Sequence, residues 1–384
     1  MVGFQQTDIG LIPKEWEVKQ LNELTMLMTN GFVGTAKTHY SNNDNAVLYI
    51  QGYNVIENGF NYHGIKRVTR EFHNKHKKSN LKTNDLLTVQ TGEVGLTTIV
   101  PSALEGSNCH ALIISRFKPN ICASFYSYFL NSESGQTLLK TIETGTTMKH
   151  INVGDMKYIN VPLPPLKEQE AIAEVLSDTD ALITKLEQRI AKKRLIKQGA
   201  MQTLLTPQDD WEVKKLGDFL EYEQPTKYLV ADTKYNDNYD TPVLTAGKTF
   251  ILGRTNEKTG IYNNLPVIII DDFTTASKFV EFPFKVKSSA MKILKPKNKY
   301  VNMRLVFEIM QRIDFPLGGH KRHWIGEFQH LEIQVPDENE QTCIATILSD
   351  MDSEIDILEK KLSKTKELKQ GLMQQLLTGK IRLA

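Results

Sequence analysis

The chain carries the same helical sequence twice, and this repeat restricts its fold more than any other feature. The segment EQEAIAEVLSD begins at Glu168 and EQTCIATILSD begins at Glu340, an offset of 172 residues (168 to 340). The same offset holds where the segments end, because KQGAMQTLLT closes at Thr206 and KQGLMQQLLT closes at Thr378. A repeat without insertion or deletion over this length predicts two copies of one structural unit.

The repeat extends upstream of the helical segments. WEVKQL begins at Trp16 and recurs as WEVKKL from Trp211, and VGDMKYINVPLP (153–164) aligns with IGEFQHLEIQVP (325–336). Apolar residues alternate in this second pair, a period typical of half-buried strands. The intervening parts are β-rich and interrupted by Gly, Asn and Pro, yet they share little sequence with each other. A repeated frame around two unlike inserts predicts two different binding domains.

Each helical segment has a narrow apolar seam, which predicts a coiled coil roughly 58 Å long at about 1.5 Å per residue. The seam residues are Leu176, Thr179, Ile183, Leu186 and Ile190 in the first copy, and Leu348, Met351, Ile355, Leu358 and Leu362 in the second. Acidic residues precede basic ones in both copies, so antiparallel pairing sets acid against base. The alternative is that each helix caps only its own domain, although a capping helix presents a wider apolar face.

These patterns predict an α+β fold with a pseudo-twofold internal repeat. Two mixed α/β, β-rich domains are expected to be separated by two long antiparallel coiled-coil helices, with the variable domains at opposite ends. The expected boundaries are 1–164 for the first domain, 165–206 for a central spacer helix, 207–337 for the second domain and 338–384 for a C-terminal spacer helix.

Composition narrows the classes of function. The hydrophobic fraction is 40% and the charged fraction 24%, as in soluble globular proteins. No run of about 18 apolar residues occurs, and the N-terminus lacks a basic start followed by an apolar run, so we expect no membrane span and no secretion. Cys109, Cys122 and Cys343 form no CxxC pair, which favours a reducing cytoplasm. Because the net charge is only +2, any nucleic-acid surface must be local.

Several patterns associated with catalysis or ligand binding are incomplete. AGKTF (246–250) ends like a phosphate-binding loop, but Pro242 stands where its leading glycine belongs. Pro336-Asp337 with Glu359-Lys360-Lys361 resembles a nuclease set, although the second element lies on a predicted coiled-coil helix. Two histidine pairs lack the carboxylate or cysteine companion of a metal site: His73 with His76, and His320 with His323. We therefore expect no catalytic residue and no metal on this chain.

Basic side chains are concentrated in HGIKRVTREFHNKHKKSNLK (63–82), where Glu71 is the one acid. This local density of cations suits contact with phosphates, although a solubilising surface has the same pattern. The DNA-binding candidates in this segment are Lys66, Arg67, Arg70, Lys75, Lys77 and Lys78.

A second set of candidates lies just before the last strand of each half, in GTTMKHI (145–151) and GGHKRHW (318–324). Glycines followed by cations allow a loop to place donors at base edges, where Arg and Lys prefer guanine. The candidates are Lys149 and His150 in the first half, and Lys321, Arg322 and His323 in the second.

The paired pattern EQxxIAxxLSDxD…KQGxMQxLLT, with the terminal LLTGKIRL, resembles the DNA specificity subunit of type I restriction–modification systems. The resemblance covers the whole chain and implies two target-recognition domains, each reading half of an interrupted site in double-stranded DNA. It also implies that the helices at 167–206 and 338–378 bind two modification (methyltransferase) subunits, which restriction subunits join. S-adenosylmethionine, ATP and Mg are then expected on partner subunits, and no cofactor on this chain.

Two other classes of function are weighed against this interpretation. A fused enzyme acting alone requires methyl-donor or nuclease motifs, and the sequence has neither. A coiled-coil adaptor that does not contact DNA leaves the basic segments unexplained.

Overall fold

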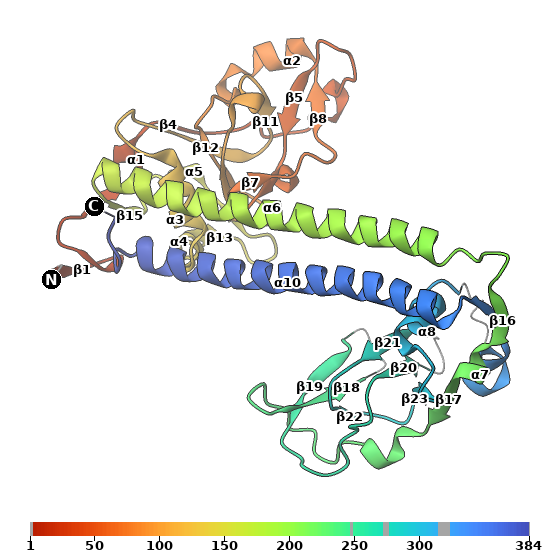
Figure 1. Cartoon of the computed structure of the whole chain (residues 1–384). Helices are drawn as coiled ribbons and strands as arrows, with labels where there is room; N and C mark the ends of the chain where they lie inside the picture. Colours follow the sequence, from red (N-terminus) through yellow and green to blue (C-terminus); the bar gives the residue numbers. More distant parts are fainter. Residues whose placement is uncertain (1–2, 246–248, 272–275, 314–322, 384) are drawn as a thin grey trace. The chain divides into compact units, whose positions relative to one another are not determined.

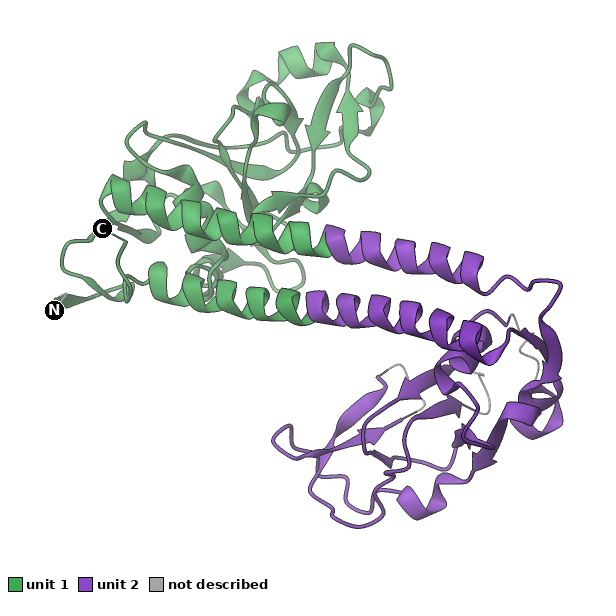
Figure 2. Ribbon diagram, viewed as in Figure 1, with its two compact units in different colours: residues 1–187, 360–384 green, residues 188–359 purple. Residues whose placement is uncertain are grey.

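The computed structural model describes residues 3–245, 249–271, 276–313 and 323–383. The chain divides into two compact units (Figure 2): unit 1 contains Met1–Glu187 and Lys360–Ala384, and unit 2 contains Gln188–Glu359. The division passes through both long helices, so each unit contains part of each. We call the part of unit 1 outside these helices the first domain, and the corresponding part of unit 2 the second domain.

The long helices are α6 (Leu166–Leu204) and α10 (Glu338–Leu376), with 39 residues each (Figure 1). In unit 1, Lys366 of α10 forms an ion pair with Glu187 of α6 at 2.7 Å. In unit 2, Lys193 of α6 pairs with Glu354 of α10, also at 2.7 Å. A second ion pair in each unit gives the direction: Asp180 pairs with Lys369 in unit 1, and Lys197 with Asp352 in unit 2. In both units the residue number falls along α10 as it rises along α6, which confirms the antiparallel pairing predicted from charge.

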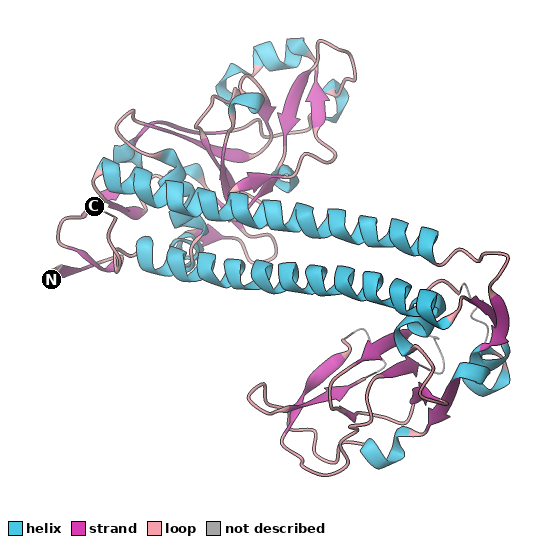
Figure 3. Ribbon diagram, in the orientation of Figure 1, coloured by secondary structure: helices cyan, strands magenta, loops and turns pink. Residues whose placement is uncertain are grey.

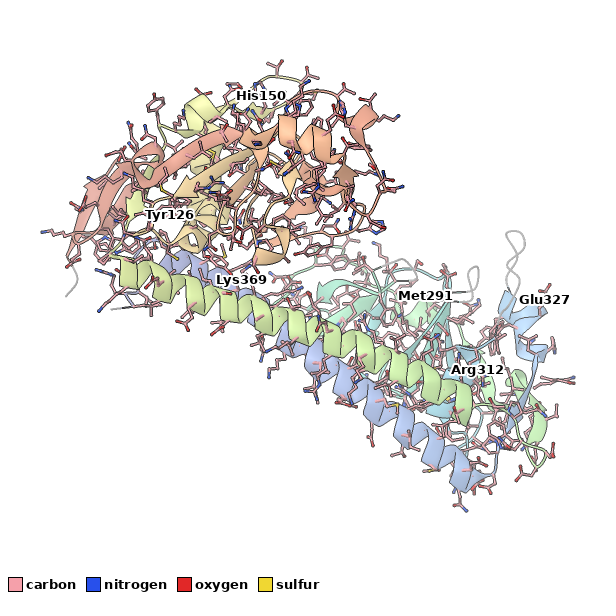
Figure 4. All side chains as sticks on the ribbon, turned by 90° about the horizontal axis from the view of Figure 1, so that it is seen from above. Tyr126, His150, Met291, Arg312, Glu327 and Lys369 are labelled. Carbon is pink, nitrogen blue, oxygen red and sulfur yellow. The ribbon has the colours of Figure 1, made fainter. Side chains whose placement is uncertain are left out.

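The predicted apolar seam is the contact surface of the helices. Six of its ten residues are buried and the other four are partly buried; the buried ones are Leu176, Leu186 and Ile190 on α6, and Leu348, Ile355 and Leu358 on α10. Arg312, labelled in Figure 4, donates a hydrogen bond to the carbonyl of Leu205, directly after α6. A cation at this position stabilises the carbonyl groups that a helix C-terminus leaves unpaired. Among the described residues, no helix is both long and apolar enough to span a membrane.

The first domain contains two main sheets (Figure 3). The four-stranded antiparallel sheet has the order β10 (Thr97–Ile99), β9 (Leu86–Val89), β12 (Leu112–Phe117), β4 (Thr25–Asn30). The three-stranded sheet has the order β11 (Asn108–Cys109), β5 (Val47–Ile50), β8 (Lys66–Val68). Two-stranded pairs are β1 (Phe4–Thr7) with β2 (Gly10–Pro13), β3 (Glu17–Gln20) with β15 (Asn160–Leu163), β6 (Val55–Ile56) with β7 (Gly59–Phe60), and β13 (Glu143–Thr144) with β14 (His150–Ile151).

Short helices complete the first domain and connect its strands. The α-helices are α1 (Leu21–Leu24), α2 (Arg70–Lys75), α3 (Ala123–Asn131), α4 (Glu133–Thr141) and α5 (Val153–Met156). The 3-10 helices are η1 (Lys37–His39), η2 (Gly52–Asn54), η3 (Lys77–Ser79) and η4 (Ser102–Leu104). Helix α3 buries Phe125, Tyr126 and Phe129 in the domain core.

The second domain repeats this plan with different residues. Its four-stranded sheet has the order β17 (Leu220–Glu223), β23 (Met291–Pro296), β20 (Val267–Asp271), β21 (Ser277–Val280). Its three-stranded sheet has the order β19 (Ile251–Thr255), β18 (Thr241–Leu244), β22 (Lys285–Val286), and β16 (Glu212–Lys215) pairs with β24 (Glu332–Val335). Its helices are α7 (Leu216–Phe219), α8 (Met303–Met310) and α9 (His323–Gly326), with η5 (Pro225–Tyr228) and η6 (Phe328–His330). The internal repeat predicted from the sequence is therefore structural as well.

The repeated tryptophans join each domain to its helices. Trp16 is 1% exposed and shares a core cluster with Leu176 of α6 and Leu376 of α10. Trp211 is 6% exposed and packs with Leu205 and with Leu348 of α10. Each tryptophan directly precedes the strand that pairs with β15 or β24, so the same side chain sets the domain against the helical pair in both units.

Candidate nucleic-acid interface

The predicted cations of the first domain lie on consecutive elements. Lys66 and Arg67 are on β8, Arg70 and Lys75 are the first and last residues of α2, and Lys77 and Lys78 begin η3. All of them are exposed. Within the described ranges, no carboxylate lies at ion-pair distance from any of these six side chains. We call this set the basic surface; its charges are available to a polyanion.

Local packing turns these cations outward. Thr69 begins α2 as its N-cap, and its Oγ1 accepts a hydrogen bond from Phe72 N at 3.3 Å. Phe72 is 3% exposed, in a cluster with Tyr49 and Val68, so this helix buries one aromatic side chain and leaves its charged ones in solvent. The His76 ring lies 4.4 Å from the Phe72 ring. Partial burial lowers the pKa of His76 below its ordinary value of 6.5, which favours a neutral imidazole under the basic surface.

Lys149 and His150 lie on the hairpin of β13 and β14; His150 is labelled in Figure 4. Gly145 turns this hairpin with φ +92°, and a Cβ atom there would lie 2.2 Å from the Met148 carbonyl oxygen, so the turn requires glycine. Lys149 is 65% exposed in its side chain, and its Nζ lies 2.9 Å from Glu143 Oε2. This candidate therefore has a partner of its own, which a phosphate must replace.

The end of β5 connects the hairpin with the basic surface. Tyr49 of β5 lies opposite Lys66 of β8. Three residues after Tyr49, a Cβ built on Gly52 would lie 3.6 Å from the carbonyl oxygen of Thr91. Thr91 in turn forms an isolated antiparallel β-bridge with His150. The two predicted groups of the first domain are thus separated by this short stretch of chain.

Gln51, in this stretch, is a polar residue that the sequence reasoning missed. Its Nε2 lies 3.3 Å from Tyr40 Oη, and Tyr53 Oη donates to its Oε1 at 2.9 Å. Two tyrosines therefore fix the orientation of a partly exposed amide, the group that proteins use to read adenine. The available signal was QGYN directly after the apolar run VLYI.

In the second domain, Lys321 and Arg322 lie outside the described residues. His323 begins α9, and its side chain is also outside the description. The next residue, Trp324, is 1% exposed, and its ring lies 6.0 Å from that of Phe328. These three DNA-binding candidates stay predictions, as do the eight of the first domain.

A second candidate surface, on the long helices, consists of exposed residues that are identical in the two copies. These are Gln198, Gly199 and Gln202 on α6, and Gln370, Gly371 and Gln374 on α10, each pair at the offset of 172 (198 to 370). One turn earlier, Ile196 is 45% exposed and Leu368 58% exposed. We call these two sets the paired helix faces. In unit 1, the face on α10 lines a cleft of about 730 Å³ together with Glu133 of α4.

Comparison with known proteins assigns the family. A sequence model described as "Type I restriction modification DNA specificity domain" matches residues 13–194 and 208–367. The chain therefore belongs to the type I restriction–modification DNA specificity family, which confirms the resemblance seen in its repeated helices.

Individual relatives agree with this assignment. The chain is 46% identical over 159 residues to the type I restriction enzyme EcoR124I/EcoR124II specificity subunit of Escherichia coli, covering 40% of this chain and 38% of that protein. It is 25% identical over 439 aligned positions to the putative type I restriction enzyme MjaX specificity subunit of Methanocaldococcus jannaschii, covering 99% and 97%. Its fold is similar to that of the type I restriction–modification S subunit from M. genitalium, with a TM-score of 0.66, 18% identity, and coverage of 94% and 96%.

Proposed function

We propose that this chain is the non-catalytic DNA-recognition subunit of a type I restriction–modification complex. It reads an interrupted target in double-stranded DNA, with one half-site for each domain. The observation that carries the proposal is one scaffold built twice from different residues: both domains have the same pair of sheets, but the sequences between the repeated strands are unlike. A duplicated scaffold with divergent surfaces suits two different half-sites, since base readout depends on individual side chains.

The basic surface supplies the sequence-independent part of this binding in the first domain. Unpaired Lys and Arg side chains release counterions from DNA when they contact phosphates. Readout of bases is assigned to the hairpin with Lys149 and His150, to Gln51, and to the corresponding 318–324 segment of the second domain. Methyl transfer and cleavage belong to partner subunits, which hold S-adenosylmethionine, ATP and Mg, and the assembled complex acts in the cytoplasm.

Binding of partner subunits is assigned to the paired helix faces. The two helical copies can be compared with each other position by position. Leu195 and Glu367 occupy matching exposed positions and differ. Gln198 and Gln370 are also exposed, yet they are identical. Identity at exposed positions of both helices supports a shared external contact.

The glycines of these faces strengthen the inference. Glycine inside a helix destabilises it by about 1 kcal/mol relative to alanine. Nothing lies within 4 Å of a Cβ built on Gly199 or on Gly371, so internal packing does not require either glycine. The missing side chain instead leaves room for an approaching chain, beside the exposed Ile196 and Leu368. Two equal faces suit two copies of one partner, the modification subunit.

A domain exchange tests the reading of two half-sites. The second domain (residues 207–337) is replaced by that of another family member, and methylated adenines are mapped in cells that also express the modification subunit. We expect one half of the methylated motif to change and the other to stay as it was. Changes in both halves, or a motif that does not depend on this chain at all, would contradict the proposal.

A second experiment tests the partner surface. The double variant Gly199→Leu with Gly371→Leu places a bulky side chain on each face, at positions where nothing lies within 4 Å of a Cβ atom. We expect it to fold normally but to lose copurification with the modification subunit. Gly154→Leu, also in open space but outside the long helices, is the matched control. Full complex formation by the double variant would place the partner elsewhere.

A further inference from the structure

The strand register of the two domains reveals a correspondence that the linear repeat does not contain. In the first domain, β8 runs antiparallel to β5 and places Arg67 opposite Leu48. Two residues further along β5, Ile50 pairs in the parallel direction with Cys109 of β11. The position of Arg67 in the sheet is therefore defined by the two pairings of β5, one with β8 and one with β11.

The second domain has the same arrangement. Strand β19 runs antiparallel to β18 and places Arg254 opposite Pro242. Two residues further along β18, Leu244 pairs in the parallel direction with Val286 of β22. Arg254 therefore occupies in the second domain the position that Arg67 occupies in the first.

A backbone hydrogen bond to each arginine confirms the correspondence. Ser41 N donates a hydrogen bond to the Arg67 carbonyl oxygen at 3.1 Å, and Asn236 N donates to the Arg254 carbonyl oxygen at 3.1 Å. The sequence separation of the arginines is 187 (67 to 254) rather than the 172 of the helices, so comparison in the helical frame does not align them. Their neighbours differ as well, because Gly253 stands where Lys66 is expected.

Both guanidinium groups lack a charged partner. Arg67 is exposed, and Arg254 Nη1 donates to the backbone carbonyl of Asp240 at 2.8 Å, a neutral acceptor. Across the described segments, neither arginine lies within ion-pair distance of a carboxylate. Each is a positive charge on a backbone held rigidly by pairing, and each is able to exchange solvent or a neutral acceptor for an anion.

We propose that Arg67 and Arg254 are equivalent phosphate-contacting residues, one for each half-site, and this inference rests on the proposed function. The two domains differ in almost every exposed side chain around these positions, as expected if they read different bases. A cation kept at one register position in both suits the part of DNA that does not vary with sequence, which is the phosphate backbone. Arginine also binds phosphate through two parallel N–H groups.

The test uses the complex of this chain with its modification subunit and a DNA duplex containing the methylated motif. Dissociation constants are measured over a range of salt concentrations for Arg67→Ala and Arg254→Ala. Each variant should bind roughly tenfold more weakly at low salt, and the slope of log K against log salt should fall by about one, as for loss of one phosphate contact. The methylated motif in cells should be unchanged. Arg→Lys at either position should keep the slope.

Lys258→Ala is the matched control, because Lys258 is an exposed cation of the same domain whose Nζ lies 3.5 Å from Asp240 Oδ2. We expect it to keep the slope of the unaltered complex. An arginine variant that changes one position of the motif would identify a base-reading residue and overturn the phosphate assignment, as would an unchanged slope. Failure of the unaltered complex to bind DNA would overturn the proposed function, and this inference with it.

Discussion

Lys369 Nζ lies 2.8 Å from Asp180 Oδ1, and the residues that match them in the other helical copy repeat the contact, with Lys197 Nζ 2.7 Å from Asp352 Oδ2. In unit 1, Tyr128 of α3 also donates to Asp180, at 3.0 Å. The aspartate at this position thus joins its own helix, the opposite helix and the adjacent domain. Each unit has this junction, although the domain supplies a different donor in each.

The two junctions should differ in strength. Lys197 also lies 3.2 Å from Glu308, which is completely buried, whereas the second acid at Lys369, Glu57, is about half exposed. Lys197→Met should therefore destabilise unit 2 by about 2 kcal/mol, because the buried Glu308 loses one charged donor and keeps Arg304 of α8, whose Nη2 lies 2.8 Å from its Oε1. Lys369→Met should cost unit 1 about 1 kcal/mol. Urea unfolding followed by hydrogen exchange in each unit measures both, and equal losses would contradict this ranking.

Arg382 should be essential for the stability of unit 1. Its Nη2 donates to Glu168 Oε2 at 2.8 Å, and its Nη1 to Glu15 Oε2 at 2.9 Å. Glu168 is 3% exposed, and among the described residues its carboxylate has one other donor, Trp16 Nε1 at 3.0 Å. Arg382→Ala leaves this buried charge with one neutral donor, so we expect a loss of about 3 kcal/mol in thermal unfolding. The exposed Lys380 is the control: Lys380→Ala should change the melting temperature little.

Acid should destabilise the first domain through its histidines. Burial lowers the pKa of His73, His76 and His110 below 6.5, and nearby Arg70 and Lys77 lower that of His73 further. Because the unfolded chain then binds protons more readily than the folded one, stability falls as pH drops below about 6.5 and is unaffected by these groups above it.

The melting temperature of unit 1 between pH 7.5 and 5 measures this effect. His76→Phe retains an aromatic ring against Phe32 and Phe72 but removes one titrating group, so its pH dependence should be shallower. A melting temperature that is constant, or that rises on acidification, would show that the imidazoles are not the source.

Gly145→Ala should weaken recognition of the first half-site. An alanine at φ +92°, 2.2 Å from the Met148 carbonyl oxygen, forces the turn before Lys149 to rearrange. We expect reduced methylation of cellular sites with unchanged thermal stability, because the turn is at the surface. Gly154→Ala, with open space around its Cβ, should behave like the unaltered protein. Normal methylation by Gly145→Ala would exclude this hairpin from DNA recognition.

The helices should set the distance between half-sites. One added heptad after Leu186 and one after Leu358 keep the apolar seam in register and lengthen each helix by about 10 Å, close to three base pairs at about 3.4 Å each. The added base pairs also rotate one half-site relative to the other, so affinity should fall. Methylome sequencing should return the same half-sites with a longer spacer. An unchanged spacer with full activity would contradict this role.

The features predictable from sequence were those with a local period. The seam through Leu176 and Leu348 follows from a spacing of three and four residues, and the strands at β15 and β24 follow from alternation. Antiparallel pairing of the helices followed from their charge gradient, because unlike charges meet only in that orientation.

The remaining features depend on contacts between residues distant in sequence. The parallel pairing of β5 with β11 joins Ile50 to Cys109, and no periodic pattern specifies such a partner. The match between Arg254 and Arg67 depends on the corresponding pairing in the second domain. The loops between strands differ in length in the two domains, so the sequence offset of the arginines differs from that of the helices. The partner of Lys149 was missed for a related reason: Glu143 meets it only because the hairpin turns at Gly145.

Unit 1 is assembled from two segments at opposite ends of the sequence, and this governs the order in which a ribosome can complete the protein. Its core cluster contains Trp16 and Ile172, but also Met373, Leu376 and Leu377. Unit 2 is one continuous segment, Gln188–Glu359, all of which is synthesised before those last residues. The ordinary sequence of co-translational folding, N-terminal domain first, is thereby reversed. The half of the molecule that is translated first is the last to acquire its complete core.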